Sequence, residues 1–247
     1  IPGAAHAPRA QVHINNAVSA MLDAIDNPNI NHLRRFFSDR DYRNTVISAI
    51  SSASLRKEWV TWQDARTPAK QEEDLQAARW RMQYFTDNPV ARNILAQPET
   101  TFNMREIIDA QRNEGRGKIF LAHIPTVAPL SADLAALIGK MIITQFIAAA
   151  FGRSDTPEND RPDFLLFIDE FQQYIMPDIR DILDMGRSYH FSLIMSHQYL
   201  GQVREGAIID SILSNVRNNV VYNLEADDAS TFAKIFGDTR FLSDFRR

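Results

Sequence analysis

The chain has 247 residues, of which 45% are hydrophobic and 23% are charged, as in an ordinary globular protein. Its net charge is −4, so no overall basic field attracts a polyanion and we expect any nucleic-acid contact to be local. The absence of cysteine excludes disulfides and thiolate metal sites. The sequence shows no signal peptide and no uninterrupted apolar run of about eighteen residues. We therefore expect a soluble segment, with any membrane anchor outside it.

The first hundred residues carry a helical pattern. Residues 11–25 place apolar side chains at helical spacing, and an Asp-Asn-Pro sequence ends that predicted helix. From 29 to 97 the same spacing recurs between short polar breaks, without strand-like alternation. We predict an all-α subdomain over residues 30–100. We expect its tryptophans to be core residues rather than base-stacking platforms, and its arginines to form a solvated face rather than a nucleic-acid patch.

Strands and helices alternate after residue 101. The predicted strands are 119–124, 164–168, 191–196 and 219–224, and the predicted helices are 104–111, 130–151, 177–188, 206–214 and 227–236. Strands separated by helices of this kind indicate right-handed crossovers and a parallel sheet. The second part of the chain is therefore predicted to be α/β, with a mostly parallel sheet.

One predicted strand ends in two carboxylates. Phe164–Ile168 is a continuous apolar run, typical of a strand buried on both faces, and Asp169 and Glu170 follow it directly. Chemistry in open α/β sheets lies just beyond the carboxyl ends of the strands. This is the arrangement of a Walker B motif, in which the aspartate holds Mg²⁺ and the glutamate orients or deprotonates the water that attacks a γ-phosphate. The alternative is a buried strand whose end happens to be acidic.

Two further polar residues lie close to the predicted strand 191–196. Gln198 follows its end, and its amide offers a donor and an acceptor for a γ-phosphate and the attacking water; the alternative is an ordinary loop residue. Arg187 lies near the C-terminal end of the preceding helix, where the helix dipole favours a cation whatever its function. A planar cation at a subunit edge can also stabilise charge on a neighbour's γ-phosphate, as an arginine finger.

A nucleotide motor needs a phosphate-cradling loop, Gly-x-x-x-x-Gly-Lys-Ser/Thr, between a strand and a helix, and the sequence contains none. Gly115–Lys118 is the nearest approach, but it is too short and precedes a predicted strand. Either the loop lies upstream of Ile1, or the protein does not hydrolyse nucleotide. The six histidines have no metal-ligand spacing.

Three phrases of the sequence carry a family resemblance: LLFIDEFQQY, GRSYHFSLIMSHQYLGQV and SNVRNNVVYNLEADDASTFAKIFG. In order and spacing they resemble the type IV secretion and conjugation coupling ATPases, the TraG/TraD-like proteins, which are related to the HerA and FtsK translocases. The resemblance implies a RecA-like P-loop NTPase core with a mostly parallel sheet and an inserted all-α subdomain. Residues 1–29 would then be a helix of the motor core, 30–100 the all-α subdomain, and 101–247 the C-terminal part of the motor domain.

The resemblance also implies roles for single residues. Carried over by position, Asp169 serves Mg²⁺, Glu170 the hydrolytic water, Gln198 the γ-phosphate, and Arg187 the site of a neighbouring subunit. The implied cofactors are ATP and Mg²⁺, with Asp169, Glu170 and Gln198 as the cofactor-binding residues. Because the family's phosphate-binding loop has no counterpart here, we expect this segment alone to be inactive as an ATPase and monomeric or weakly associated.

At the level of the whole protein, the resemblance implies a hexameric ring of identical subunits that moves DNA, or a relaxase–DNA complex, in conjugative transfer or type IV secretion. We expect it in the cytoplasm, at the inner face of the membrane in its full-length form, with upstream segments that contact the membrane and secretion-channel proteins. Two alternatives stay open: a non-catalytic substrate-docking adaptor with a motor-like fold, and a HerA-like DNA repair translocase. A phosphate-binding loop encoded upstream would favour the motor over the adaptor.

Overall fold

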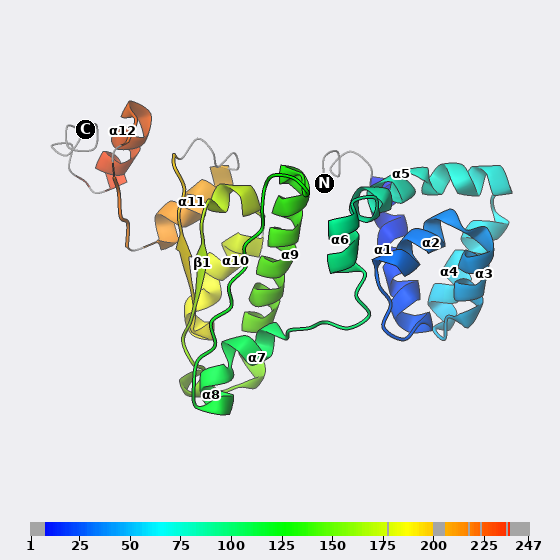
Figure 1. Ribbon diagram of the computed structural model, residues 1–247, viewed down its shortest axis with the longest axis horizontal. Coiled ribbons are helices and arrows are strands. Elements are labelled where there is room, and N and C mark those ends of the chain that lie inside the picture. The colour runs from blue at the N-terminus through cyan, green and yellow to red at the C-terminus, as the bar shows by residue number, and fades with distance from the viewer. Residues whose placement is uncertain are drawn as a thin grey trace. The chain divides into compact units, whose positions relative to one another are not determined.

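The computed structural model describes residues 8–176, 178–199, 206–216, 218–222, 224–235 and 237. The chain divides into two compact units (Figure 1). The helical unit consists of the residues up to 102 together with 125–135. The sheet unit consists of 103–124 together with the residues from 136 onward.

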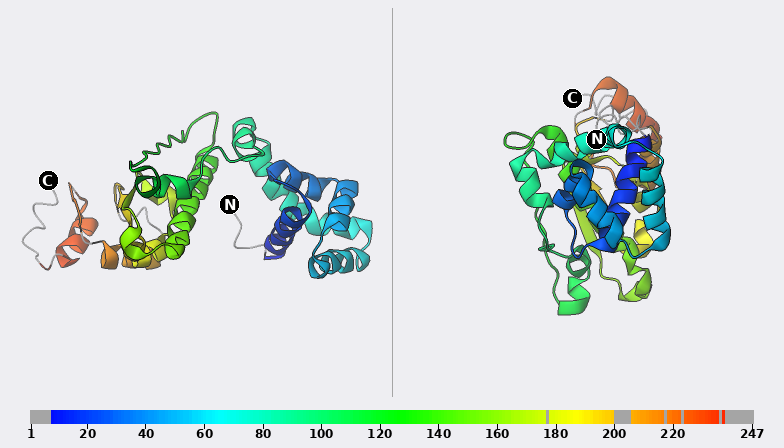
Figure 2. Two further views of the ribbon diagram at one scale, coloured as in Figure 1. Left: turned by 90° about the horizontal axis from the view of Figure 1, so that it is seen from below. Right: turned by 90° about the vertical axis from the view of Figure 1, so that its right-hand side faces the viewer.

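The helical unit is built from short helices joined by polar turns. Their bounds are α1 (Pro8–Ala24), α2 (Ile30–Ser38), α3 (Arg40–Ala49), α4 (Ala53–Asp64), α5 (Pro68–Thr86) and α6 (Pro89–Leu95). Side-chain oxygens of Asn29, Asp39, Thr67 and Asn88 accept hydrogen bonds from first-turn N–H groups, which fixes where α2, α3, α5 and α6 begin. Figure 2 shows the same unit, blue to cyan, from two further directions.

Helix α1 lies inside this unit, because it packs against α5, α3 and α2. The core contains Phe36, Trp59 and Leu75, and the rings of Phe36 and Trp59 meet edge to face with centroids 5.0 Å apart. Residues 30–100 contain helices and no strand. The assignment of residues 1–29 to a motor core remains a prediction.

Two side chains of the helical unit differ from the expectations drawn from the sequence. Trp80 is 64% exposed, whereas Trp59 lies in the core as expected. Arg43 is fully buried rather than solvated. Its guanidinium donates to the carbonyl of Phe36 at 3.0 Å and to the Glu72 carboxylate at 2.9 Å. A buried arginine requires such partners, and these come from other helices that its own helical pattern does not report.

The sheet unit contains the two strands of the described chain. Strands β1 (Phe164–Ile168) and β2 (Phe191–Met195) pair in parallel, with Phe164 opposite Phe191 and Ile168 opposite Met195. The helices are α7 (Met104–Ile108), α8 (Ala110–Glu114), α9 (Ala132–Phe151, from residue 136 onward), α10 (Asp178–Met185), α11 (Gly206–Asn215) and α12 (Ala226–Ile235). Short 3₁₀ helices complete the unit: η2 (Gly152–Asp155), η3 (Glu158–Asp160), η4 (Phe171–Tyr174) and η5 (Gly186–Tyr189).

The core of the sheet unit joins α9 to the strands and to α10. Phe146 of α9 stacks on Phe164 of β1, which stacks on Phe191 of β2, with centroids 5.4 and 5.6 Å apart. Ile179 and Ile182 of α10 are buried in the same cluster. Since α10 connects the two parallel strands, its apolar face holds them in register and brings their carboxyl ends to one edge.

The other two predicted strands are wrong. Residues 119–124 form no strand: Phe120 packs on Phe146, but Ile119 and Leu121 are 89% and 88% exposed. In the predicted strand 219–224, every described residue is likewise outside a strand. Their apolar alternation fits a pleated surface, yet a strand also needs a backbone partner beside it. The described residues thus form a small two-stranded parallel sheet, and they do not show a RecA-like core.

Helix α9 and η2 together form one stretch, residues 132–155. By length and composition alone, this stretch is long and apolar enough to cross a membrane. Its face toward the strands is nevertheless packed, with Ile143, Phe146, Ile147 and Ala150 all buried in the core of the sheet unit. Buried core helices of soluble proteins reach the same length and apolar composition, so this stretch is only weak evidence for a membrane span.

Candidate nucleotide-hydrolysis edge

The carboxyl ends of β1 and β2 form a polar edge, here called the carboxyl edge and made of Asp169, Glu170, Ser196 and Gln198. The parallel register places Asp169 directly after Ile168 and Ser196 directly after Met195, so the two residues follow paired strand positions. Backbone hydrogen bonds hold the junction, because Ser196 N donates to Ile168 O at 3.0 Å and Phe171 N donates to Ser196 O at 2.9 Å.

Asp169 is an exposed carboxylate with a fixed orientation. Its Oδ1 accepts from the Ser196 hydroxyl and, at 3.1 Å, from the backbone N–H of Glu170. Its Oδ2 has no hydrogen-bond partner among the described residues. One oxygen thus anchors the side chain, while the other is available to an incoming cation or water.

Glu170 has an unusual backbone conformation for a side chain of its kind. Its φ and ψ are 49° and 47°, in the left-handed region, which costs roughly 1–2 kcal/mol for a residue with a Cβ. The fold holds this conformation through the Phe171–Ser196 hydrogen bond and a second one from Gln173 N to Glu170 O at 3.0 Å. Strain of this kind gathers at functional sites and motivates a functional hypothesis for Glu170.

The Glu170 carboxylate meets two glutamine side chains. Gln198 Nε2 donates to Glu170 Oε1 at 2.9 Å, and Gln172 Nε2 donates to Oε2. The predicted neighbours Asp169, Glu170 and Gln198 are therefore brought together. No ion pair neutralises the two carboxylates within the described chain, so this edge carries net negative charge. The nearby Tyr174 responds to it: burial raises the pKa of its phenol, and the charge of Asp169 raises it further.

The donor set suits Mg²⁺, which takes oxygen ligands and is usually held by one or two protein carboxylates together with waters and substrate phosphates. Asp169 provides one such carboxylate oxygen. No group of three or more His, Asp or Glu side chains suited to a metal occurs among the described residues, so an all-protein metal cage is absent from that part of the chain. The residues fit a magnesium ion that takes one ligand from Asp169 and its other ligands from a phosphate and waters. They do not provide the loop that would bind the phosphate itself.

Arg187 lies at the opposite end of the strands. It belongs to η5, which leads into the amino end of β2, and the strands span five residues at roughly 3.3 Å each. Its side chain is exposed, and no hydrogen bond or ion pair joins it to a described residue. The structure therefore brings Gln198 to Glu170 but not Arg187, so Arg187 cannot reach the carboxyl edge of its own chain without a rearrangement.

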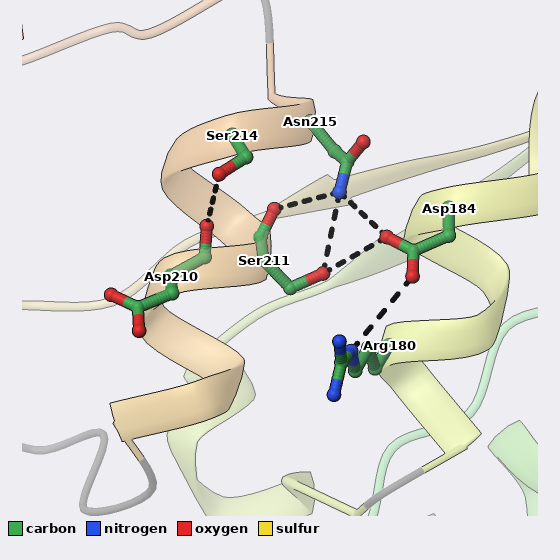
Figure 3. A pocket seen from close by; sticks show the side chains of 6 residues that line it. All are labelled: Arg180, Asp184, Asp210, Ser211, Ser214 and Asn215. Atoms are coloured by element: carbon green, nitrogen blue, oxygen red, sulfur yellow. Dashed lines mark hydrogen bonds and ion pairs between the residues drawn. The ribbon is translucent and has the colours of Figure 1, made fainter.

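A separate polar pocket of about 290 Å³ lies between α10 and α11 (Figure 3). Asp184 is its hub: Oδ1 accepts from Asn215 Nδ2 at 2.7 Å and from Ser211 Oγ at 3.2 Å, and Arg180 Nε lies 3.8 Å from Oδ2. The residues that line it are Arg180, Asp184, Asp210, Ser211, Ser214 and Asn215. These contacts order the rim of the pocket and leave the Asp210 carboxylate without a described partner.

Ser196 ends the predicted strand 191–196, but the sequence assigns no functional role to Ser196 or to Gln172. Both contact the carboxylates of the carboxyl edge. The signal for Ser196 was present, since a hydroxyl follows β2 at the position where Asp169 follows β1. The left-handed conformation of Glu170 had no sequence signal, because glycine or asparagine is the usual marker of such a position.

These observations define an α/β protein with an acidic, glutamine-lined edge at the ends of two parallel strands. Residues 163–246 match the family model described as the TraM recognition site of TraD and TraG, and this range contains the carboxyl edge, Arg187 and the α10–α11 pocket. The predicted resemblance to the TraG/TraD-like coupling proteins is confirmed over this part of the chain. The match implies a role in conjugative transfer coupling. No curated protein and no solved structure matches the chain.

Proposed function

We propose that this chain supplies the magnesium-binding and water-activating half of an ATPase site in a conjugative coupling protein. The observation that carries the proposal is the meeting of Asp169, Glu170 and Gln198 at one strand edge, with the Gln198 amide 2.9 Å from the Glu170 carboxylate. Coupling proteins of the TraG/TraD family are generally ATPases, which supports this use of the edge. The phosphate cradle would come from a part of the complete protein outside this sequence.

Each side chain of the edge has a distinct task in this proposal. Asp169 would hold Mg²⁺ through its carboxylate, and the ion would supply positive charge that neutralises the phosphate oxygens. Glu170 accepts a proton from the water that attacks the γ-phosphorus, while the bond from that phosphorus to the bridging oxygen breaks and ADP leaves. Gln198 binds Glu170 and presents its amide oxygen to the water. Ser196 and Gln172 keep the two carboxylates in place.

We further propose that identical subunits form a ring that moves DNA, or a relaxase–DNA complex, at the cytoplasmic face of the membrane. The isolated position of Arg187 supports a shared site. An exposed arginine side chain without a partner among the described residues, remote from its own carboxyl edge, suits a finger that reaches the nucleotide of a neighbouring subunit. The family match supports the conjugative setting over a repair translocase.

A TraM-like partner is the second element of the proposal, because the matched family description names TraM recognition. The α10–α11 pocket lies within the matched range and presents the carboxylates of Asp184 and Asp210, which suit a basic side chain of a partner protein. We expect Asp210→Lys to weaken capture of a TraM-like protein, and Asp160→Lys, outside the matched range, to leave it unchanged. Equal capture by both variants would remove the pocket from the interface.

The motor and the adaptor alternatives differ in turnover. Mg-ATP hydrolysis is measured for the complete protein that contains this chain, with and without DNA, beside Asp169→Asn and the control Asp160→Asn, an exposed carboxylate in η3. The motor predicts DNA-stimulated turnover that Asp169→Asn loses at ordinary Mg²⁺ and Asp160→Asn keeps. Absence of both ATP binding and turnover in the unsubstituted complete protein would favour the adaptor.

A further inference from the structure

The turn that carries Arg187 is held by side chains from elsewhere in the sheet unit. This turn, here called the finger turn and made of residues 186–190, comprises η5 and His190, whose φ is 53°. Its close approach to β2 requires a glycine at 186, since a Cβ there would lie 2.6 Å from the carbonyl oxygen of Phe191. The finger turn is therefore a tight, strained connection that needs external support to keep one shape.

Arg153 provides the buried part of that support. Its side chain is fully buried, and Nη1 donates to the carbonyl of Tyr189 at 2.8 Å and to that of His190 at 3.3 Å. Nε donates to the Asp109 carboxylate at 2.9 Å, and Nη2 donates to the carbonyl of Ile108 at 2.5 Å. One guanidinium thus ties two carbonyls of the finger turn to the α7–α8 junction.

Arg161 provides the outer part. Its Nη1 donates to the carbonyl of Ser188 at 2.6 Å, its Nε donates to the carbonyl of Thr156 at 2.9 Å, and its guanidinium lies 5.2 Å from the centre of the Tyr189 ring. His190 adds a contact between its Nδ1 and the Asp163 carboxylate at 2.8 Å. Three consecutive carbonyls of the finger turn, those of residues 188 to 190, therefore accept from arginines.

We infer that Arg153 and Arg161 are positioning residues, which fix the finger turn so that Arg187 projects from the subunit toward a neighbouring nucleotide. The inference rests on the proposed function, since it gives the fixed turn a task in the shared site. The Arg187 side chain has no hydrogen-bond or ion-pair partner among the described residues, so its direction depends on the backbone that carries it. Arginine suits the clamp because its planar, multiply donating head can bind several carbonyls at once.

The test uses complete protein assembled from two kinds of subunit. Donor subunits carry Glu170→Gln, so they lack a working site but keep Arg187. Acceptor subunits carry Arg187→Ala, so they keep the site but lack the finger. Turnover in the mixture then comes from an acceptor site completed by a donor's Arg187. Arg161→Met is added either to donors or to acceptors, with Arg116→Met, at an exposed position, as the matched control.

We expect Arg161→Met to lower the restored turnover about ten-fold when it lies in the donor and to have little effect in the acceptor, because a small displacement of a catalytic group costs this much or more. Arg116→Met should be silent in both. Hydrogen exchange of the amides at residues 188–190 should accelerate only with Arg161→Met. A merely structural role predicts equal losses in donor and acceptor.

Equal losses, or no loss in either subunit, would overturn the inference while the proposed function stands. Donors and acceptors that lack the Arg161→Met substitution form the reference mixture. If this mixture restores no turnover although each kind of subunit binds ATP, Arg187 is not a shared finger. That result would contradict the proposed role of Arg187 and the inference that depends on it.

Discussion

The two ends of the β1–β2 pair use polar residues in opposite ways. At the carboxyl edge, Asp169 and Glu170 are held by neutral groups, namely the Ser196 hydroxyl and the amides of Gln172 and Gln198, and no cation in the described chain neutralises them. At the amino end, Arg153 and Arg161 donate hydrogen bonds to backbone carbonyls, and Arg153 also pairs with Asp109.

This contrast separates reactive groups from structural ones within a single small sheet. Charged side chains whose donors are all bound by carbonyls and carboxylates of the protein stabilise the fold. Charged side chains that are oriented by neutral groups but not neutralised remain available to a ligand. By this criterion the carboxyl edge is the chemical end of the sheet unit, and the amino end is its support, from which the Arg187 side chain projects without a described partner.

The largest expected effect on stability comes from the support. Arg153→Met removes a buried guanidinium from three backbone carbonyls and from Asp109, which is 5% exposed and keeps Arg105 as a partner, and the loss should be about 3 kcal/mol in the free energy of unfolding. Urea unfolding of the variant measures it. Arg116→Met, an exposed control, should change the same quantity by less than about 0.5 kcal/mol. A loss as small for Arg153→Met would mean that the amino end is not the support described.

The next largest expected effect is a loss of ATP turnover without a loss of folding stability. Gln198→Ala removes the amide that binds Glu170, and we expect turnover of the complete protein to fall about 100-fold, at the low end of the loss caused by removing a single catalytic hydrogen-bond donor. The unfolding free energy should stay nearly unchanged, since Gln198 is exposed. Steady-state kinetics and urea unfolding on the same samples give both values. A large loss of stability would instead place Gln198 with the structural residues.

A smaller effect is expected at Ser196. Ser196→Ala removes the hydroxyl that orients Asp169, and a hydrogen bond to a charged group contributes about 1.5–3 kcal/mol. Exposure of the site to water reduces this, so we expect the Mg²⁺ concentration for half-maximal turnover to rise about 3- to 10-fold with the maximal rate largely kept. Ser192→Ala, on an exposed position of β2, is the control. An unchanged Mg²⁺ requirement would argue against metal binding at Asp169.

The smallest effect is a pH dependence at the amino end. The Arg105 side chain, with help from Thr156, lowers the pKa of the Asp155 carboxyl below its ordinary value of 3.8. A lowered folded-state pKa means that the contribution to stability is present above 3.8 and is lost as the pH falls through the folded-state value. Asp155→Asn should therefore be slightly less stable than the unsubstituted chain near pH 6, and the difference should shrink below pH 3.8. Urea midpoints across this range measure it.

The sequence predicted well those features that a local pattern determines. Mostly apolar segments followed by polar residues placed β1, β2 and the three predicted residues of the carboxyl edge, because parallel strands bring their ends together by geometry alone. The segments 119–124 and 219–224 have the same local character, but their described residues pair with no strand. Whether an apolar segment becomes a strand depends on a neighbour that the segment itself does not encode.

The buried arginines show the same difficulty. Arg153 is 44 residues from Asp109 and 36 from Tyr189, and Arg43 is 29 from Glu72. A cation in a sequence predicts a solvated face unless its partners are known, so the clamp on the finger turn emerges only from the fold. The left-handed backbone of Glu170 is likewise imposed by the hydrogen bonds from Phe171 N to Ser196 O and from Gln173 N to Glu170 O, and not by a local turn residue.

The measurement that tests the central claim most directly compares ATP binding and ATP turnover in the complete protein and in its Glu170→Gln variant. The amide keeps the size and planar shape of the side chain and one accepting oxygen, but it cannot take a proton from water. We predict that ATP binds to both proteins equally well and that turnover falls by about 100-fold or more in the variant. Equal turnover in the two proteins would show that Glu170 is not the base and that the carboxyl edge is only the end of a strand.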